Sequence, residues 1–250
     1  MAATGLPLRN ALWLTAERIL RLAVTAGVLV LVARQLQPAG FAQLAFAISF
    51  TGLFTPLAML GLEVLLVGEF VARPSQGGTL LGTAVVLRLL AGGSSALLCL
   101  GLAFAAPILQ DTAWFILPLS LGLIWQGAEV TDLWFQRHLQ SRRTAMVRFA
   151  VVLVGAAIKI VLVWRDAPPV WFAWAVMGDV LMFELGLLWS YARMPQKAGA
   201  WHFDAALAGR LVRRAWPVAL AGVLLALQAR FDQFVVKACL PEAEAGAYFA

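Results

Sequence analysis

The sequence predicts an all-α fold, a polytopic transmembrane helical bundle. Of the 250 residues, 62% are hydrophobic and only 13% are charged, whereas soluble domains are about 45–50% apolar. The mean hydropathy of +0.85 supports the same class. A helix needs about 20 mostly apolar residues to cross a bilayer core. The chain has seven such runs, at approximately residues 11–33, 41–62, 80–105, 114–136, 145–164, 170–191 and 215–238.

The first run is expected to stay in the protein as a membrane helix. Glu17, Arg18 and Arg21 interrupt its first half, and no small-residue cleavage site precedes the following loop, so the run does not have the pattern of a signal peptide. The loops on one side of the membrane are all short, which makes the helices antiparallel neighbours in one bundle. These loops are residues 35–40, 106–113, 165–169 and 241–246.

The positions of Lys and Arg predict a cytoplasmic N-terminus. With that orientation only Arg34 and Arg165 fall in the outward loops, and the inward loops are rich in cations, which follows the positive-inside rule. The net charge of +6 therefore reflects membrane topology, and no nucleic-acid partner is expected. The inward cations are Arg9, Arg73, Arg137, Arg142, Arg143, Arg148, Arg193, Lys197, Arg210, Arg213 and Arg214.

The longest connection, residues 193–214, predicts a boundary between two helical lobes. It contains MPQKAGAWHFDAALAGRLVRR, a linker followed by a basic amphipathic segment at the cytoplasmic surface. A weak internal repeat supports the boundary, because Trp13 and Trp216 each begin an apolar helix that is followed by a Pro-containing turn. We expect a six-helix lobe at 1–192, the linker, and the first helix and start of the second helix of a further, truncated lobe at 215–250.

Cysteine and histidine indicate no metal site, disulfide framework or cofactor. Cys99 and Cys239 lie in or at the edge of separate runs, without the spacing of a metal site. His138 and His202 both fall on the predicted cytoplasmic side.

Charged residues inside the apolar runs are the candidate functional residues, because ionisable groups at membrane depth are costly and normally face a bundle interior or a water-filled cavity. Purely structural interpretations stay open for three of these residues. Lys159 can snorkel to the surface, and Glu129 and Asp132 can be ordinary residues of a helix interface. Glu17 can also simply pair with Arg21 along one helix. The predicted cationic cavity consists of Arg18, Arg21, Arg88, Lys159 and Arg230, and the predicted ion-coupling or charge-pairing residues are Glu17, Glu129, Asp132, Asp179, Glu184 and Asp232.

A cavity with a cationic bias predicts an anionic cargo. Arg side chains bind phosphate oxygens through two parallel hydrogen bonds, and a low-dielectric vestibule screens the attraction less than water does. A pyrophosphate head group with attached sugars suits such a cavity. The acidic positions would then bind a coupling proton or sodium ion.

Three stretches resemble bacterial polysaccharide flippases, the O-antigen type exporters of the multidrug/oligosaccharidyl-lipid/polysaccharide superfamily. The first, from Ala33, is ARQLQPAGFAQLAFAISFTGLFTPLAMLGL. Here Gln37 replaces the middle Gly of the family's Leu-Gly-Pro turn and Ala42 replaces the Gly after the aromatic residue, so we expect Pro38 and Gly40 to keep the turn.

The other two stretches lie in the second half of the chain. DLWFQRHLQSRRTAMVRF from Asp132 is similar to the family's end of helix four and its basic loop. RFDQFVV from Arg230 is similar to the middle of helix seven, which a Gly-x-Tyr follows, here at Gly246 and Tyr248.

The resemblance implies a transporter and not an enzyme. Family members have about twelve spans in two six-helix lobes around a central cavity, and this chain would supply the first lobe and the opening of the second. The implied function is to flip undecaprenyl-pyrophosphate-linked oligosaccharide across the bacterial inner membrane, with no covalent chemistry. The implied partners are the lipid-linked oligosaccharide, the bilayer and other polysaccharide-assembly membrane proteins.

Three alternatives are weighed against the flippase. A multidrug cation antiporter of the same fold predicts an acidic cavity without the surplus of Arg18, Arg21 and Arg88. A membrane-integral glycosyltransferase or ligase predicts a large loop domain, an Asp-x-Asp metal pair or a catalytic His in a long outward loop, and the sequence has none of these. A purely structural scaffold is disfavoured by the density of charge at membrane depth.

Overall fold

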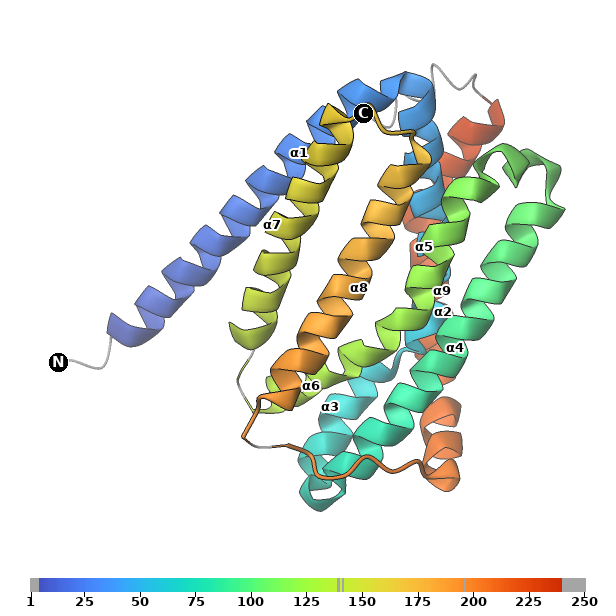
Figure 1. Cartoon of the computed structure of the whole chain (residues 1–250). Helices are drawn as coiled ribbons and strands as arrows, with labels where there is room; N and C mark the ends of the chain where they lie inside the picture. Colours follow the sequence, from blue (N-terminus) through green and yellow to red (C-terminus); the bar gives the residue numbers. More distant parts are fainter. Residues whose placement is uncertain (1–4, 139, 141, 196, 240–250) are drawn as a thin grey trace.

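The computed structural model describes residues 5–138, 140, 142–195 and 197–239, and this part of the chain is an all-α bundle without strands (Figure 1). The predicted fold class is confirmed. Six helical stretches are long and apolar enough to cross a membrane, and the first of them, Arg18–Ala72, contains two crossings. The helices are α1 (Gly5–Gly52), α2 (Thr55–Met59), α3 (Leu62–Ala72), α4 (Gly77–Ala105), α5 (Ala113–Trp125), α6 (Val130–Arg137), α7 (Arg142–Trp164), α8 (Val170–Ala192) and α9 (Ala205–Cys239), with short 3₁₀ turns η1 (Pro74–Gln76), η2 (Pro107–Thr112) and η3 (Gln126–Glu129).

Helix α1 is a helical hairpin that reverses direction at Gln37. The first half rises to one end of the bundle and the second half descends inside it (Figure 1). Gln37 has φ 56° and ψ 170°, a conformation that suits glycine, and Pro38 begins the descending half. The expectation that Pro38 and Gly40 keep the turn is therefore only half right. Gly40 is helical, and a Cβ there would make an ordinary contact with Pro169 Cγ at 3.4 Å, so the position does not require a glycine.

The second crossing is broken near the middle of the bundle. After α1 ends, the short α2 leads to Leu60 and Gly61, which both have left-handed conformations, and α3 continues from there to Ala72. The break packs against α9, because a Cβ on Gly61 would lie 2.8 Å from Val218 Cβ. The second span is thus longer than the predicted run of residues 41–62, and it is interrupted where that run ends.

The fourth crossing is also broken. Helix α5 passes through the 3₁₀ turn η3 into α6. Glycines let this crossing lie close to α4: a Cβ on Gly92 would overlap the carbonyl oxygen of Leu123, and a Cβ on Gly127 would lie 3.1 Å from Leu89 Cδ2. Both broken crossings therefore flank the middle of α4.

The predicted linker is fixed to the bundle and is not a free tether. The Tyr191 hydroxyl accepts hydrogen bonds from Ala198 N (3.0 Å) and Trp201 Nε1 (3.1 Å), and Asp204 N donates to Thr83 Oγ1 (3.1 Å). The backbone near His202 lies so close to α4 that a Cβ on Gly82 would come within 2.7 Å of the His202 oxygen. This part of the linker lies along the start of α4.

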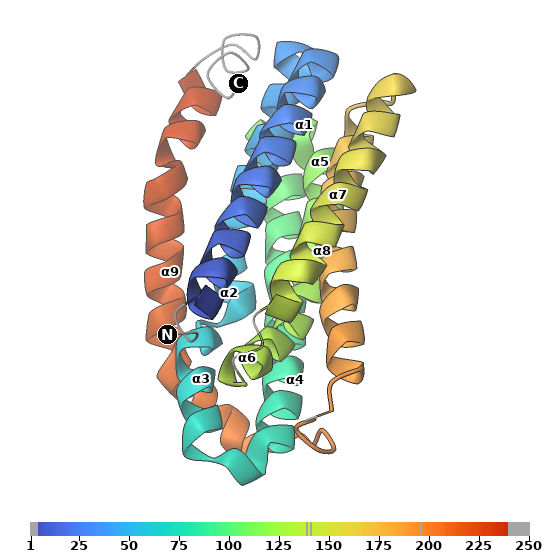
Figure 2. The same ribbon diagram turned by 90° about the vertical axis from the view of Figure 1, so that its left-hand side faces the viewer.

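The predicted basic segment forms the first turns of α9. Asp204 caps the helix, because its Oδ1 accepts from Ala206 N (2.8 Å) and Leu207 N (3.0 Å). Helix α9 then continues through Pro217 to its end and packs against α1, α2 and α3 (Figure 2). The basic segment and the seventh span are therefore one helix.

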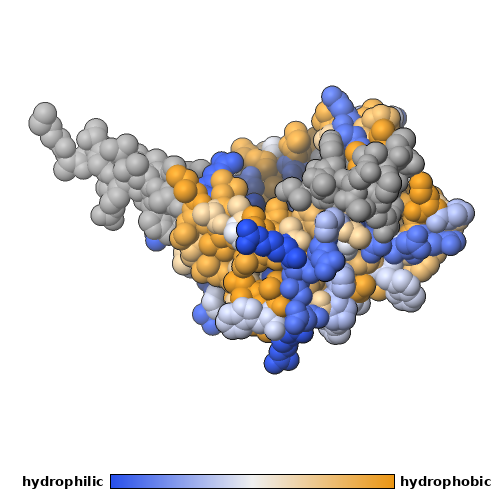
Figure 3. Space-filling view, turned by 90° about the horizontal axis from the view of Figure 1, so that it is seen from above, coloured by the Kyte–Doolittle hydropathy of each residue, from blue (hydrophilic) through white to orange (hydrophobic). Residues whose placement is uncertain are grey.

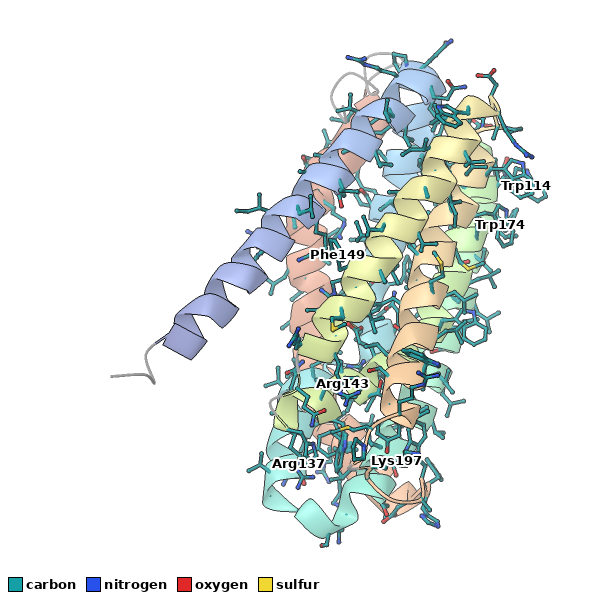
Figure 4. The ribbon with its side chains drawn as sticks, turned by 60° about the vertical axis from the view of Figure 1, so that its left-hand side comes forward. Trp114, Arg137, Arg143, Phe149, Trp174 and Lys197 are labelled. Atoms are coloured by element: carbon teal, nitrogen blue, oxygen red, sulfur yellow. The ribbon has the colours of Figure 1, made fainter. Side chains whose placement is uncertain are left out.

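Charged residues mark one end of the bundle. Arg137, Arg143 and Lys197 lie near this end, here called the basic end, whereas Trp114 and Trp174 lie toward the other (Figure 4). Seen from that opposite end, hydrophilic residues occupy part of the end face, and hydrophobic residues surround them (Figure 3). Large apolar side chains are also exposed along the flanks of the helices, as expected for a protein whose sides face lipid.

The first prediction concerns the turn of α1. Replacing Gln37 with Gly should raise the free energy of unfolding by about 1 kcal/mol, because glycine adopts this backbone conformation without a steric cost. Thermal unfolding of the detergent-solubilised protein would measure the difference. As a control, Ala39→Gly in the adjacent exposed helical position should destabilise the protein by up to about 1 kcal/mol. A loss of stability in Gln37→Gly would contradict the prediction.

Candidate functional site

The most buried charged side chain among the described residues is Arg88 of α4. It is 1% exposed, and its Nη2 donates to Glu63 Oε1 at 3.4 Å, at the start of α3. The Nε and Nη1 atoms are buried and have no hydrogen-bond partner within the described part. A guanidinium has five donors, so Arg88 retains unused hydrogen-bonding capacity.

Acidic side chains from both broken crossings and from α8 surround Arg88. Glu129 of η3 and Glu184 of α8 lie within electrostatic reach of Arg88 and of Asp132. Glu184 is 2% exposed, and its Oε2 has no hydrogen-bond partner among the described residues. Buried charges are tolerated when they are paired, and the cluster holds several carboxylates around one fully buried cation.

Asp132 is held in place from two sides. It accepts a short hydrogen bond from the Thr144 hydroxyl of α7 and one from Gln136 Nε2 at 3.1 Å. The carboxylate therefore connects α6 to α7, close to the basic loop between them.

An acidic pocket of about 310 Å³ opens beside this cluster. In the part of the chain that the structure describes, no three His, Cys, Asp or Glu side chains are arranged to hold a metal ion. The acidic pocket has the chemistry to bind a proton or a small hydrated cation, because carboxylate oxygens form much of its polar wall. Its lining residues are Glu63, Val64, Val67, Glu129, Asp132, Leu133 and Gln136.

A second charged group lies between α7 and α8. Lys159 Nζ donates to Asp179 Oδ2 in a short ion pair, so the side chain does not snorkel to the surface. The two side chains remain partly exposed, at 18% and 28%, and both line a cavity of about 320 Å³. The walls come from α1, α7 and α8, and this space is here called the α1–α7–α8 cavity.

Gly155 makes room for this ion pair. A Cβ at this position of α7 would overlap Asp179 Oδ1. The missing side chain lets the Asp179 carboxylate lie directly against the backbone of α7, one turn before Lys159.

The remaining predicted cations lie on α1 and α9. The Arg230 guanidinium packs against Gly52, where a Cβ would lie 2.9 Å from Nη2, and Phe234, one turn later, packs edge-on against Phe46 with ring centroids 5.4 Å apart. Arg21 lies on the first half of α1, 16 residues before the reversal at Gln37, and Gly52 lies at the end of the second half, 15 residues after it. Arg18 is exposed on α1, one turn before Arg21.

The structure thus distributes the predicted site residues over three places. Arg88, Glu129, Asp132 and Glu184 form one cluster, Lys159 and Asp179 form an ion pair, and Arg18, Arg21, Arg230 and Asp232 lie on α1 and α9. The side chain of Glu17, and residues 241–250 with their predicted loop and Gly-x-Tyr, lie outside the described residues.

Sequence reasoning missed Glu63 and Arg148. Glu63 directly follows the predicted second run. The sequence feature that could have indicated it is the preceding Leu60-Gly61 pair, which marks a break in the helix. Arg148 was counted as a loop cation, yet its guanidinium lies 4.9 Å from the centre of the Phe183 ring and close enough to Glu129 to interact with it electrostatically.

The second prediction tests the packing of the ion pair. Gly155→Ala should destabilise the protein by about 2 kcal/mol, because the new methyl group displaces the Asp179 carboxylate and strains a packed contact. Gly178→Ala is the matched control: it lies next to Asp179 on α8, and no atom lies within 4 Å of its added Cβ. Thermal unfolding in detergent measures both variants. Equal stability of the two would refute this account of Gly155.

Comparison with known proteins agrees with this arrangement of membrane helices and buried charges. The family described as polysaccharide biosynthesis protein matches residues 8–250. Searches of curated proteins and of solved structures gave no match. Members of this family are generally transporters, and their role is in polysaccharide synthesis or export. The chain is a multi-pass membrane protein and belongs to the polysaccharide biosynthesis protein family.

Proposed function

We propose that the chain is part of a transporter that flips undecaprenyl-pyrophosphate-linked oligosaccharide across the bacterial inner membrane. The basic end faces the cytoplasm, together with the N-terminus, as the positive-inside rule requires. Residues 1–192 form one lobe, residues 193–214 connect it to the next, and residues 215–250 begin the second lobe. Alternating access between the lobes moves the head group through a central cavity.

The observation that carries this proposal is the placement of two arginines on α1 and α9: Arg21 lies on the first half of α1, and Arg230 of α9 packs against Gly52 at the end of the second half. These helices belong to the two proposed lobes and pack against each other. A pyrophosphate between the lobes would be contacted from both sides, with Arg18 one turn nearer the basic end. Guanidinium groups bind phosphate oxygens in pairs, which favours a phosphorylated head group over a neutral sugar.

The acidic pocket is the proposed site of the coupling proton or sodium ion. Glu63, Glu129 and Asp132 line this pocket. Glu63 pairs with Arg88, and Glu129 and Glu184 lie within electrostatic reach of it. Gain or loss of one positive charge there would change how strongly α3, η3 and α8 are held to α4. This provides a physical connection between cation binding and the arrangement of the helices.

The rival transport function is a multidrug cation antiporter of the same fold. The acidic pocket favours it, because carboxylates attract cationic drugs. Arg88 opposes it, since this cation is fully buried among the same carboxylates. The two functions differ in the charge of their cargo, so export assays with each substrate separate them.

The third prediction concerns the cationic path. Arg230→Gln should reduce surface polysaccharide about tenfold or more, because one charge-assisted phosphate contact contributes about 1.5–3 kcal/mol. The assay uses cells in which this protein is the sole exporter, with protein amounts measured by immunoblot. Arg230→Lys should retain part of the export, and Arg34→Gln in the predicted outward loop serves as the charge-loss control. Normal export by an Arg18→Gln, Arg21→Gln, Arg230→Gln variant would exclude the cationic path.

The fourth prediction concerns coupling. Glu129→Gln, in the wall of the acidic pocket, should make transport insensitive to an imposed proton or sodium gradient, because the amide cannot change charge. Proteoliposomes containing labelled lipid-linked oligosaccharide would report the rate with and without each gradient. Glu69→Gln is the control. Glu69 pairs with Arg214 outside the acidic pocket, so this variant should keep the gradient dependence. If Glu184→Gln and Glu129→Gln both respond like the unmodified protein, the acidic pocket is not the coupling site.

A further inference from the structure

The α1–α7–α8 cavity is larger than a packing gap. Its volume of about 320 Å³ corresponds to about ten water molecules at ~30 Å³ each, and it falls within the range of small-molecule sites. It lies within the membrane-spanning part of the bundle, between the two halves of α1 and the helices α7 and α8.

The walls of this cavity are almost entirely hydrocarbon. Val28 and Val32 of α1, Ala156 of α7, and Phe172 and Val176 of α8 are typical of the lining. Cavities with such walls stay dry and accept apolar ligands. The best occupant is therefore a hydrocarbon chain, and water or a sugar would be a poor one.

One feature distinguishes this cavity from a simple lipid-filled gap: the Lys159–Asp179 ion pair forms part of its wall. An ammonium has three donors, and Asp179 engages one of them, so Lys159 can bind a second anion without leaving its partner. An occupant that carries an anionic oxygen next to its hydrocarbon chain therefore matches both parts of the wall.

The depth of the ion pair limits which lipid can supply that anion. Lys159 lies five residues before Trp164, the end of α7, which is about 8 Å along the helix, and Asp179 lies about 14 Å from the start of α8. A resident phospholipid keeps its phosphate at the membrane surface. An anionic group reaches Lys159 only when its lipid enters the protein and carries the head group below the membrane surface.

We propose that the α1–α7–α8 cavity is the subsite for the lipid part of the transported substrate. The isoprenoid units next to the phosphate lie among the aliphatic walls, and Lys159 binds a phosphate oxygen while Asp179 holds the ammonium in place. This proposal rests on the proposed function and adds to it the place where the first lobe recognises the lipid carrier.

Two adjacent alanines test the hydrocarbon part. Ala156 lines the cavity and is 8% exposed, whereas Ala157 is exposed and does not line it. The full chain is placed in nanodiscs of zwitterionic phospholipid, and binding of labelled undecaprenyl phosphate is measured. Ala156→Phe should weaken binding by at least about tenfold, because a phenyl ring fills space for several isoprenoid carbons. Ala157→Phe should bind like the unmodified protein.

Lys159→Gln tests the proposed contact between Lys159 and the phosphate. This test remains valid if Ala156→Phe fails to fold. It should weaken binding of undecaprenyl phosphate severalfold but leave binding of the uncharged alcohol undecaprenol unchanged. Equal affinity of Ala156→Phe and unmodified protein, or an equal loss of both lipids in Lys159→Gln, would overturn the proposal. So would phosphatidylglycerol that competes as well as undecaprenyl phosphate, since the cavity would then be a general lipid site.

The binding assay involves no transport, so its failure differs from failure of the proposed function. Loss of lipid binding in Ala156→Phe, together with normal export in the triple arginine variant, would leave the subsite and remove the cationic path. Normal lipid binding in Ala156→Phe together with loss of export in Arg230→Gln would remove the subsite and leave the cationic path.

Discussion

The buried guanidinium of Arg88 is the constraint on which the centre of the bundle depends. A cation at membrane depth costs several kcal/mol unless it is compensated, and Arg88 is 1% exposed. The carboxylates that compensate it come from different crossings, so none of those crossings can be moved without leaving charge unpaired. Glu63, Glu129 and Glu184 thereby connect α3, η3 and α8 to α4.

The breaks in the second and fourth crossings are also related to the buried charge. A helix that bends near a buried charge places polar side chains and backbone close to it, and the second and fourth crossings both change direction beside α4. Glycines at the crossing points remove the side chains that would keep the backbones apart, as at Gly92 and Gly127. Close backbone packing and buried charge are thus parts of one arrangement, which gives the acidic pocket its walls.

The Arg88 cluster and the Lys159–Asp179 ion pair have different surroundings, which suggests different roles. The Arg88 cluster contains an excess of carboxylates near the basic end, whereas Lys159 and Asp179 form a balanced pair in a hydrocarbon cavity nearer the opposite end. A cation suits the first environment, and a lipid with one anionic group suits the second. The linker between Tyr191 and Asp204, fixed along the start of α4, joins α8 directly to α9. Movement of the proposed second lobe would therefore be transmitted to the Arg88 cluster.

Hydropathy and charge along the chain were enough to predict the all-α membrane bundle, because burial of backbone polar groups in lipid leaves helices as the only local solution for long apolar runs. The same reasoning identified Arg88, Glu129, Glu184, Lys159 and Asp179 as charges at membrane depth. It could not identify their partners, since an ion pair such as Lys159–Asp179 depends on how two helices are rotated toward each other.

Tertiary structure alone decided the breaks, the pairings and the cavities. Glu63 was missed because the turn at Leu60 and Gly61 is stabilised by packing against Val218, which lies more than 150 residues away in the chain. The reversal at Gln37 occurs in a residue that local preference disfavours, and contacts such as Gln35 to Asp166 (2.8 Å) hold the surrounding turn in place. Periodicity and charge report what each segment prefers by itself, whereas the site is made where segments distant in sequence meet.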